Sequence, residues 1–131
     1  MQSVCYSPEG ERPRCTGVPA ASFGLSSFAD YVQRSNSEVA AFGLVEDKIC
    51  VDNIDTVLGG GLVDCVLPGP GDLSVSYGVH GRFAHPLVQQ AIKTVIGGAR
   101  RAGIAAGLYI SDPSEVAALR SAAGRMREQV R

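Results

Sequence analysis

The sequence predicts an α/β fold in which about three parallel strands are flanked by helices. Short continuous apolar runs, which are typical of strands buried on both faces, alternate with segments whose apolar residues recur at helical spacing. The chain has 131 residues, of which 45% are apolar. That is the size of a single domain, and it is enough to bury a core. Alternation of this kind implies parallel strands joined by right-handed crossovers.

The first half of the chain predicts an irregular start, then a helix, a strand and a second helix. Proline and glycine recur through residues 1–24 and oppose helix formation there. A serine cap precedes the helix expected over 28–34, and a buried strand is expected over 39–45. The next helix is expected over 47–58, with the glycines at 59–61 ending it.

The middle of the chain predicts a second strand and the most clearly marked helix. The strand is expected over 62–67, followed by a rigid turn over 68–72 and a single helical turn over 73–77. Pro86 occupies a first-turn position, an apolar face follows at helical spacing, and Gly103 supplies the C-terminal stop.

The last predicted elements are a third strand over 104–110 and a helix over 116–130, with Asp112 as its N-cap. A parallel sheet needs both faces covered. An open sheet of three strands would also leave two strand edges exposed. We therefore expect another chain to complete this one.

Composition excludes several classes of function. The 12 basic and 13 acidic residues give a net charge of −1, so no overall field attracts nucleic acid or an acidic membrane. The longest apolar runs, such as 102–110, fall far short of the ~20 residues of a membrane span. No signal-peptide core is expected in the first 15 residues, and the four cysteines lack zinc-site spacing. Reduced thiols and a cytoplasmic location are the interpretation that follows.

Candidate site residues follow the first two strands. Glu46 comes after the first strand, and the segment 69–71 with Asp72 comes after the second. Adjacent strands lie about 4.8 Å apart, so the two carboxylates are expected at one rim. Carboxylate oxygens suit Mg²⁺ or Mn²⁺, and the Gly-Pro-Gly backbone lets N–H groups approach an anion such as a 2-keto acid carboxylate.

Simpler structural roles remain open for the same residues. Glu46 would favour the start of the next helix, and Asp72 would serve as an N-cap of the turn that follows. His85, directly before Pro86, is interpreted as a helix-start residue rather than a ligand. The arginines of the last helix are interpreted as a solvated or interface face.

Several segments occur in an order that resembles one family, the HpcH/HpaI aldolase/citrate lyase family. They are Glu46, Asp52–Asp55, Val63–Val66, Gly69–Ser74, Gly78 and His85–Val88. Tyr6–Arg12 also resembles that family's Tyr-Pro-Pro-Glu-Gly-x-Arg segment. The likeness runs from about Val4 to Ile110, most of the chain.

The resemblance implies a (β/α)₈ barrel, of which residues 1–131 would form a single partial domain of about three βα units. It also implies divalent-metal-dependent aldol chemistry, carbon–carbon bond cleavage or formation on the enolates of pyruvate-like 2-keto acids. Glu46 and Asp72 would bind Mg²⁺ or Mn²⁺, and the Gly71 and Asp72 amides would hold the keto-acid carboxylate. Arg12 is assigned to substrate binding on the same ground.

Three departures from the family's pattern shape the functional hypotheses. The catalytic histidine and enolate-stabilising arginine lie in a half of the barrel that this chain does not contain, since a full barrel takes about 250 residues. Leu44 stands where the family commonly has a keto-acid-binding glutamine. The family's last strand is also missing.

No general base is therefore identified, and His80 is the single loop histidine expected near the rim. One hypothesis is a subunit of a split aldolase-like lyase, inactive alone and completed by a second chain, since a homo-oligomer would still lack the family's base and arginine. The alternative is a non-catalytic binding or scaffold protein derived from the aldolase fold, which Leu44 favours.

Overall fold

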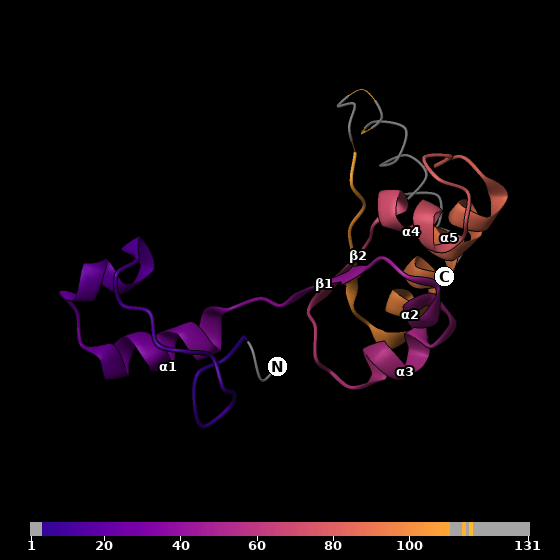
Figure 1. The fold of residues 1–131 in the computed structure, drawn as a ribbon. Coiled ribbons are helices and arrows are strands. Elements are labelled where there is room, and N and C mark those ends of the chain that lie inside the picture. Colours follow the sequence, from indigo (N-terminus) through magenta and orange to yellow (C-terminus); the bar gives the residue numbers. More distant parts are fainter. Residues whose placement is uncertain (1–3, 111–113, 115, 117–131) are drawn as a thin grey trace.

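A small parallel sheet with helices on one side organises most of the chain (Figure 1). The computed structural model describes residues 4–110, 114 and 116. The strands β1 (Phe42–Val45), β2 (Cys65–Pro68) and β3 (Ala105–Ala106) lie in the order β1-β2-β3, and both pairs are parallel. The predicted three-stranded parallel sheet is confirmed.

The register of β1 on β2 places the ends of these two strands side by side. Phe42 pairs with Cys65 and Val45 pairs with Pro68. The pairing continues one step further, because the Gly69 amide donates to the Val45 carbonyl at 2.9 Å. The residues directly after the two strands therefore meet at one rim of the sheet.

The helix predicted over 47–58 is two helices, α2 (Lys48–Asp52) and α3 (Ile54–Gly59). The break falls at Asn53, whose φ of −111° and ψ of 20° are not helical. The Asn53 side chain donates to the Ile49 carbonyl at 2.8 Å, so the amide side chain competes with the backbone for helix hydrogen bonds. Apolar spacing runs on across the break, which is why periodicity alone did not reveal it.

The segment after β2 is a helix from its second residue onward. α4 (Pro70–Ser76) replaces the rigid turn and single helical turn that the sequence suggested. Gly69 is its N-cap, and Pro70 takes the first helical position, where its missing N–H costs nothing.

α5 (Pro86–Ala102) confirms the clearest sequence prediction. The His85 imidazole Nδ1 accepts a hydrogen bond from the Leu87 amide at 3.3 Å, so the interpretation of His85 as a helix-start residue is confirmed. Gly103 closes the helix at a φ of +70°, in the left-handed region that glycine enters at little cost.

One hydrophobic cluster joins the sheet to these helices. Val45 and Val66 supply the sheet's contribution. The helices and the loop before α5 add the rest of its buried residues: Val51, Ile54, Leu58, Leu73, Val79, Val88, Ala91, Ile92, Val95 and Ala99. The cluster covers one face of the sheet.

The other face of the sheet is open among the described residues. Phe42 is 63% exposed and Leu44 62%, so the expected burial of β1 on both faces is wrong for this chain. The strands are also shorter than the apolar runs at 39–45 and 104–110, because those runs begin or continue outside the paired residues. The predicted N-cap Asp112 lies outside the described residues, as does the helix over 116–130 except for Val116.

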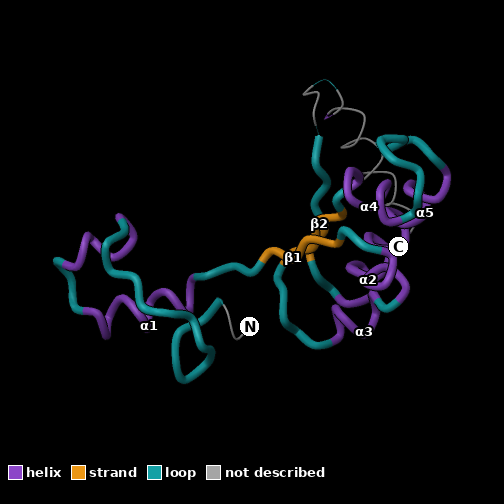
Figure 2. Tube along the Cα trace, viewed as in Figure 1, coloured by secondary structure: helices purple, strands orange, loops and turns teal. Residues whose placement is uncertain are grey.

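The N-terminal segment packs on itself and stands apart from the sheet (Figure 2). The short helix η1 (Pro19–Gly24) and α1 (Phe28–Glu38) enclose a second cluster built on Tyr6, Ala21 and Tyr31. An extended stretch leads from α1 into β1. No helix of the described residues is long and apolar enough to cross a membrane.

Candidate functional site

Glu46 lies against the turn that follows β2. A Cβ added to Gly69 would stand 2.8 Å from Glu46 Cγ and 3.1 Å from Oε1, closer than side-chain carbons ordinarily come. Gly69 has a φ of −93°, so space rather than backbone conformation requires glycine there. The carboxylate therefore rests beside the start of α4, as expected for a shared rim.

A hollow of about 430 Å³ opens at this rim. Among the described residues that line it, Glu46 is the one charged side chain, and the walls are otherwise apolar side chains and backbone. The remaining lining residues are Leu44, Leu67, Pro68, Gly69, Pro70, Gly71, Leu108 and Tyr109. A polar ligand bound there would meet one carboxylate and the backbone at the start of α4.

Asp72 lies in the first turn of α4, exposed, and does not line the hollow. The alternative role of Asp72 as an N-cap is wrong, because Gly69 takes that position. The alternative that Glu46 begins the next helix is wrong as well. Asp47 caps α2 by accepting from the Cys50 amide at 2.8 Å, so Glu46 precedes the helix.

Ser74 is a site-supporting residue that sequence reasoning missed. It is fully buried, and its hydroxyl donates to the Gly71 carbonyl at 2.6 Å and accepts from the Gly81 amide at 2.9 Å. These bonds fasten the first turn of α4 to the loop that follows the helix. The one available signal was its place directly after Asp72-Leu73.

The residues at this rim suit a divalent cation in chemical type. Two carboxylates on adjacent segments offer hard oxygen ligands, and Gly69 leaves room for the Glu46 side chain. Among the described residues no cluster of three or more His, Cys, Asp or Glu side chains has metal-site geometry. Water, substrate or another chain would have to supply the remaining ligands.

Arg12 and the two histidines lie outside this arrangement. The Arg12 guanidinium stacks 4.9 Å from the centre of the Tyr6 ring, and it donates to the Val4 carbonyl at 3.5 Å. Arg12 therefore belongs to the N-terminal segment, which Figure 1 shows away from the β1–β2 rim. His80 is exposed in the loop after α4, and His85 caps α5.

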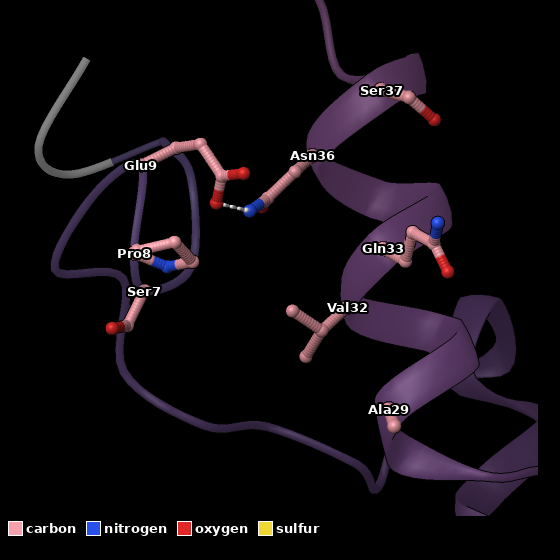
Figure 3. A pocket seen from close by; sticks show the side chains of 8 residues that line it. All are labelled: Ser7, Pro8, Glu9, Ala29, Val32, Gln33, Asn36 and Ser37. Carbon is pink, nitrogen blue, oxygen red and sulfur yellow. Dashed lines mark hydrogen bonds between the residues drawn. The ribbon is translucent and has the colours of Figure 1, made fainter.

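The N-terminal segment has an open hollow of its own, of about 550 Å³ (Figure 3). Asn36 of α1 lines this hollow and bonds to the loop on the other side of it. Asn36 donates to Glu9 Oε2 at 2.6 Å and to the Tyr6 carbonyl at 2.9 Å, and it accepts from the Tyr6 amide at 2.7 Å. These polar groups satisfy one another, so this hollow is a packing feature of the loop on α1.

The family model for HpcH/HpaI aldolase/citrate lyase matches residues 1–129. The chain belongs to this family. The three parallel strands with flanking helices are accordingly part of an α/β barrel of the HpcH/HpaI type, which confirms the resemblance on which the fold prediction depended.

Individual members of the HpcH/HpaI family agree. A hydroxypyruvate/pyruvate aldolase of Paraburkholderia phytofirmans is 35% identical over 104 residues, which are 79% of this chain and 39% of that protein. A 5-keto-4-deoxy-D-glucarate aldolase of Shigella boydii is 35% identical over 108 residues, 82% of this chain and 41% of that protein.

Solved HpcH/HpaI structures share the fold. A family protein from Burkholderia cenocepacia superposes with a TM-score of 0.75 at 35% identity, covering 88% of this chain and 44% of that one. An aldolase from Desulfitobacterium hafniense gives 0.72 at 26% identity, covering 98% and 56%. This chain thus spans about two-fifths of the length of the curated relatives it matches.

Proposed function

We propose that this chain is the metal-binding part of an aldolase that makes or breaks a carbon–carbon bond next to a pyruvate-like 2-keto acid. The observation that carries the proposal is Glu46, the one charged side chain that residues 4–110 contribute to the hollow at the strand ends, with Asp72 on the adjoining segment. The aldolase activity of the relatives named above agrees with it.

The proposed roles rest on the family's pattern, and the places of these residues after β1 and β2 agree with them. Glu46 and Asp72 would hold Mg²⁺ or Mn²⁺, which would supply Lewis-acid stabilisation of negative charge on the keto acid. The amides of Gly71 and Asp72, in the first turn of α4, have no acceptor within their own helix and bind the keto-acid carboxylate. Ser74 keeps the Gly71 peptide in place through its bond to the Gly71 carbonyl.

A Schiff-base mechanism has no support among these residues. The chain has two lysines, Lys48 and Lys93, and neither lines the hollow. The hydrogen bond from Lys48 to Asp52, and the charge of Asp52, raise the pKa of Lys48. Lys48 therefore stays an ammonium group, whereas a Schiff-base nucleophile needs a neutral amine.

The proposal requires further βα units from a second chain, because among residues 4–110 one face of the sheet is open and no general base is identified at the rim. Phe42, Leu44 and Tyr109 are exposed apolar side chains on the strands or beyond them that such units would cover. Within this chain Arg12 stacks on Tyr6 rather than lining the hollow. A contact between Arg12 and substrate would therefore need that assembly. We place the protein in the cytoplasm, where its four free cysteines would stay reduced.

The test is native mass spectrometry of the protein purified from its own cells, followed by assay of pyruvate release from 4-hydroxy-2-keto acids. We expect a complex with Mg²⁺ or Mn²⁺, and a loss of at least a hundredfold in kcat/KM in Glu46→Gln or Asp72→Asn. Asp55→Asn, in an exposed ion pair with Arg101, is the matched control and keeps activity.

Intact activity in both site variants would remove the metal role. A metal-free assembly without turnover would favour the second candidate, a binding or scaffold protein. The observation that favours it is Leu44, which presents an apolar side chain to the hollow beside Glu46.

A further inference from the structure

We propose that Ser76 is a positioning residue that sets the spacing of the Glu46 and Asp72 carboxylates. The inference rests on the proposed metal site and concerns a hydroxyl that has no role in it so far. Ser76 Oγ, at the last residue of α4, accepts a hydrogen bond from the Lys48 amide at 2.9 Å. Lys48 is the first residue of α2 and comes two positions after Glu46.

The Lys48 amide needs an acceptor from outside its helix. The first N–H groups of a helix have no intrahelical partner. Asp47 supplies the acceptor for the Cys50 amide at 2.8 Å, and Ser76 supplies the acceptor for Lys48. The second bond joins residues 28 positions apart in the sequence, so it connects two segments rather than ending one helix.

Two hydrogen bonds therefore bracket the proposed metal ligands. At the strand ends, the Gly69 amide donates to the Val45 carbonyl at 2.9 Å. Farther along, the Lys48 amide donates to Ser76 Oγ. Glu46 lies between the two bonds on one segment, and Asp72 lies between them on the other.

The hydrogen bond at Ser76 also orients Asp72, because the two residues belong to the same face of α4. Residues four apart in a helix share a face, and Asp72 and Ser76 are four apart in α4. The bond to Lys48 turns this face toward the segment that carries Glu46. Glu46 and Asp72 lie on the two segments that this bond joins, and two carboxylates brought to one cation repel each other before it binds. A bond that resists their separation thereby preorganises the pair.

The test is a titration with Mn²⁺ of the chain in the assembly purified from its own cells and stripped of metal, followed by electron paramagnetic resonance. Ser76→Ala is expected to weaken Mn²⁺ binding about three- to tenfold, since one hydrogen bond that orients the ligands is lost. Ser76→Thr keeps the hydroxyl, so its Mn²⁺ affinity is expected to stay within about twofold of that of the unmodified chain. Ser76→Val has the shape of threonine without the hydroxyl, so its Mn²⁺ affinity is expected to match that of Ser76→Ala.

Thr94→Ala is the matched control. Thr94 Oγ1 donates to the Gln90 carbonyl at 2.9 Å within α5, so this variant loses a hydroxyl hydrogen bond that touches neither segment. We expect its Mn²⁺ affinity to stay unchanged. A loss in Thr94→Ala equal to that in Ser76→Ala would show a general stability effect and overturn the positioning role.

Glu46→Gln separates the two levels of the proposal. Loss of binding in Glu46→Gln, with unchanged affinity in Ser76→Ala, would overturn the role of Ser76 and leave the proposed function standing. Equal Mn²⁺ binding by the assemblies that carry Glu46→Gln and the unmodified chain would overturn both, as would failure of the unmodified assembly to bind Mn²⁺.

Discussion

Gly69→Ala tests whether the resting place of the Glu46 side chain matters. The added methyl carbon would stand 2.8 Å from Glu46 Cγ. Two carbons are most favourable about 3.5–4.0 Å apart, so Cγ has to retreat by about 0.7 Å. Gly69 already has a φ of −93°, and alanine keeps the amide that bonds to Val45. The one change is therefore the displacement of Glu46.

The displacement of Glu46 is expected to weaken Mn²⁺ binding far more than it lowers the free energy of unfolding. Moving a half-buried side chain off its rotamer costs roughly 0.5–1.5 kcal/mol. Replacing glycine by alanine at a compatible backbone recovers about 0.4–1 kcal/mol through the unfolded state. Ligand groups must hold their geometry to about 0.5 Å. We therefore expect stability within about 1 kcal/mol of the unmodified chain and Mn²⁺ affinity at least tenfold weaker.

The assay pairs Mn²⁺ titration with urea denaturation. Gly59→Ala is the control, because an added Cβ there meets no atom within 4 Å and its φ is not positive. Unchanged Mn²⁺ affinity in Gly69→Ala would refute the idea that Glu46 binds the ion from beside Gly69. A loss of stability far above that of Gly59→Ala would show that the backbone, rather than Glu46, gives way.

Three further predictions concern the packing and the thiols. Leu58→Ala removes a 2%-exposed core side chain and is expected to lower the free energy of unfolding by about 2–5 kcal/mol in urea denaturation. Asn36→Ala breaks the bonds to the Tyr6 backbone, so hydrogen exchange at the Tyr6 amide should rise about tenfold or more while α5 stays protected. Desolvation, and secondarily Asp47, raise the pKa of Cys50, so iodoacetamide should label it more slowly at pH 9.0 than in urea. The folded state holds the Cys50 thiol proton more tightly than the unfolded state does, so the free energy of unfolding should fall as pH rises above the ordinary thiol pKa. Equal labelling rates in the folded and the urea-unfolded chain would contradict the raised pKa of Cys50.

Local chemistry explains which parts of the fold could be predicted from the sequence. α5 was predictable because Pro86, an unbroken apolar face and Gly103 all indicate the same helix. α4 was not, because the glycines around Pro70 also suit a turn. The break at Asn53 depends on a side-chain hydrogen bond to the Ile49 carbonyl, and apolar spacing carries no record of such a bond.

The candidate site, like the fold, could be predicted from the sequence only in part. Parallel strands with matched ends make Glu46 and the Gly69 turn neighbours, and strand order alone was enough to expect that. Ser74 and Ser76 were beyond sequence reasoning, because each bonds to a backbone group on a segment that periodicity cannot identify. Which sheet face is covered was equally beyond it, since an apolar run such as 39–45 looks the same in a whole barrel and in part of one.

Leu44 bears most directly on what this site binds. Side chains two apart on a strand point to the same face, and Leu44 and Glu46 accordingly line the same hollow. A leucine donates no hydrogen bond, so a keto acid held beside Glu46 gains no polar contact from β1. Under the proposed function, the polar contacts that the described residues of this rim offer to its carboxylate are then those of the Gly71 and Asp72 amides. The geometry of α4 would then affect keto-acid binding more in this chain than in family members that have a glutamine before the glutamate. The hydrogen bonds of Ser74 and Ser76, which hold α4 in place, would matter more for the same reason.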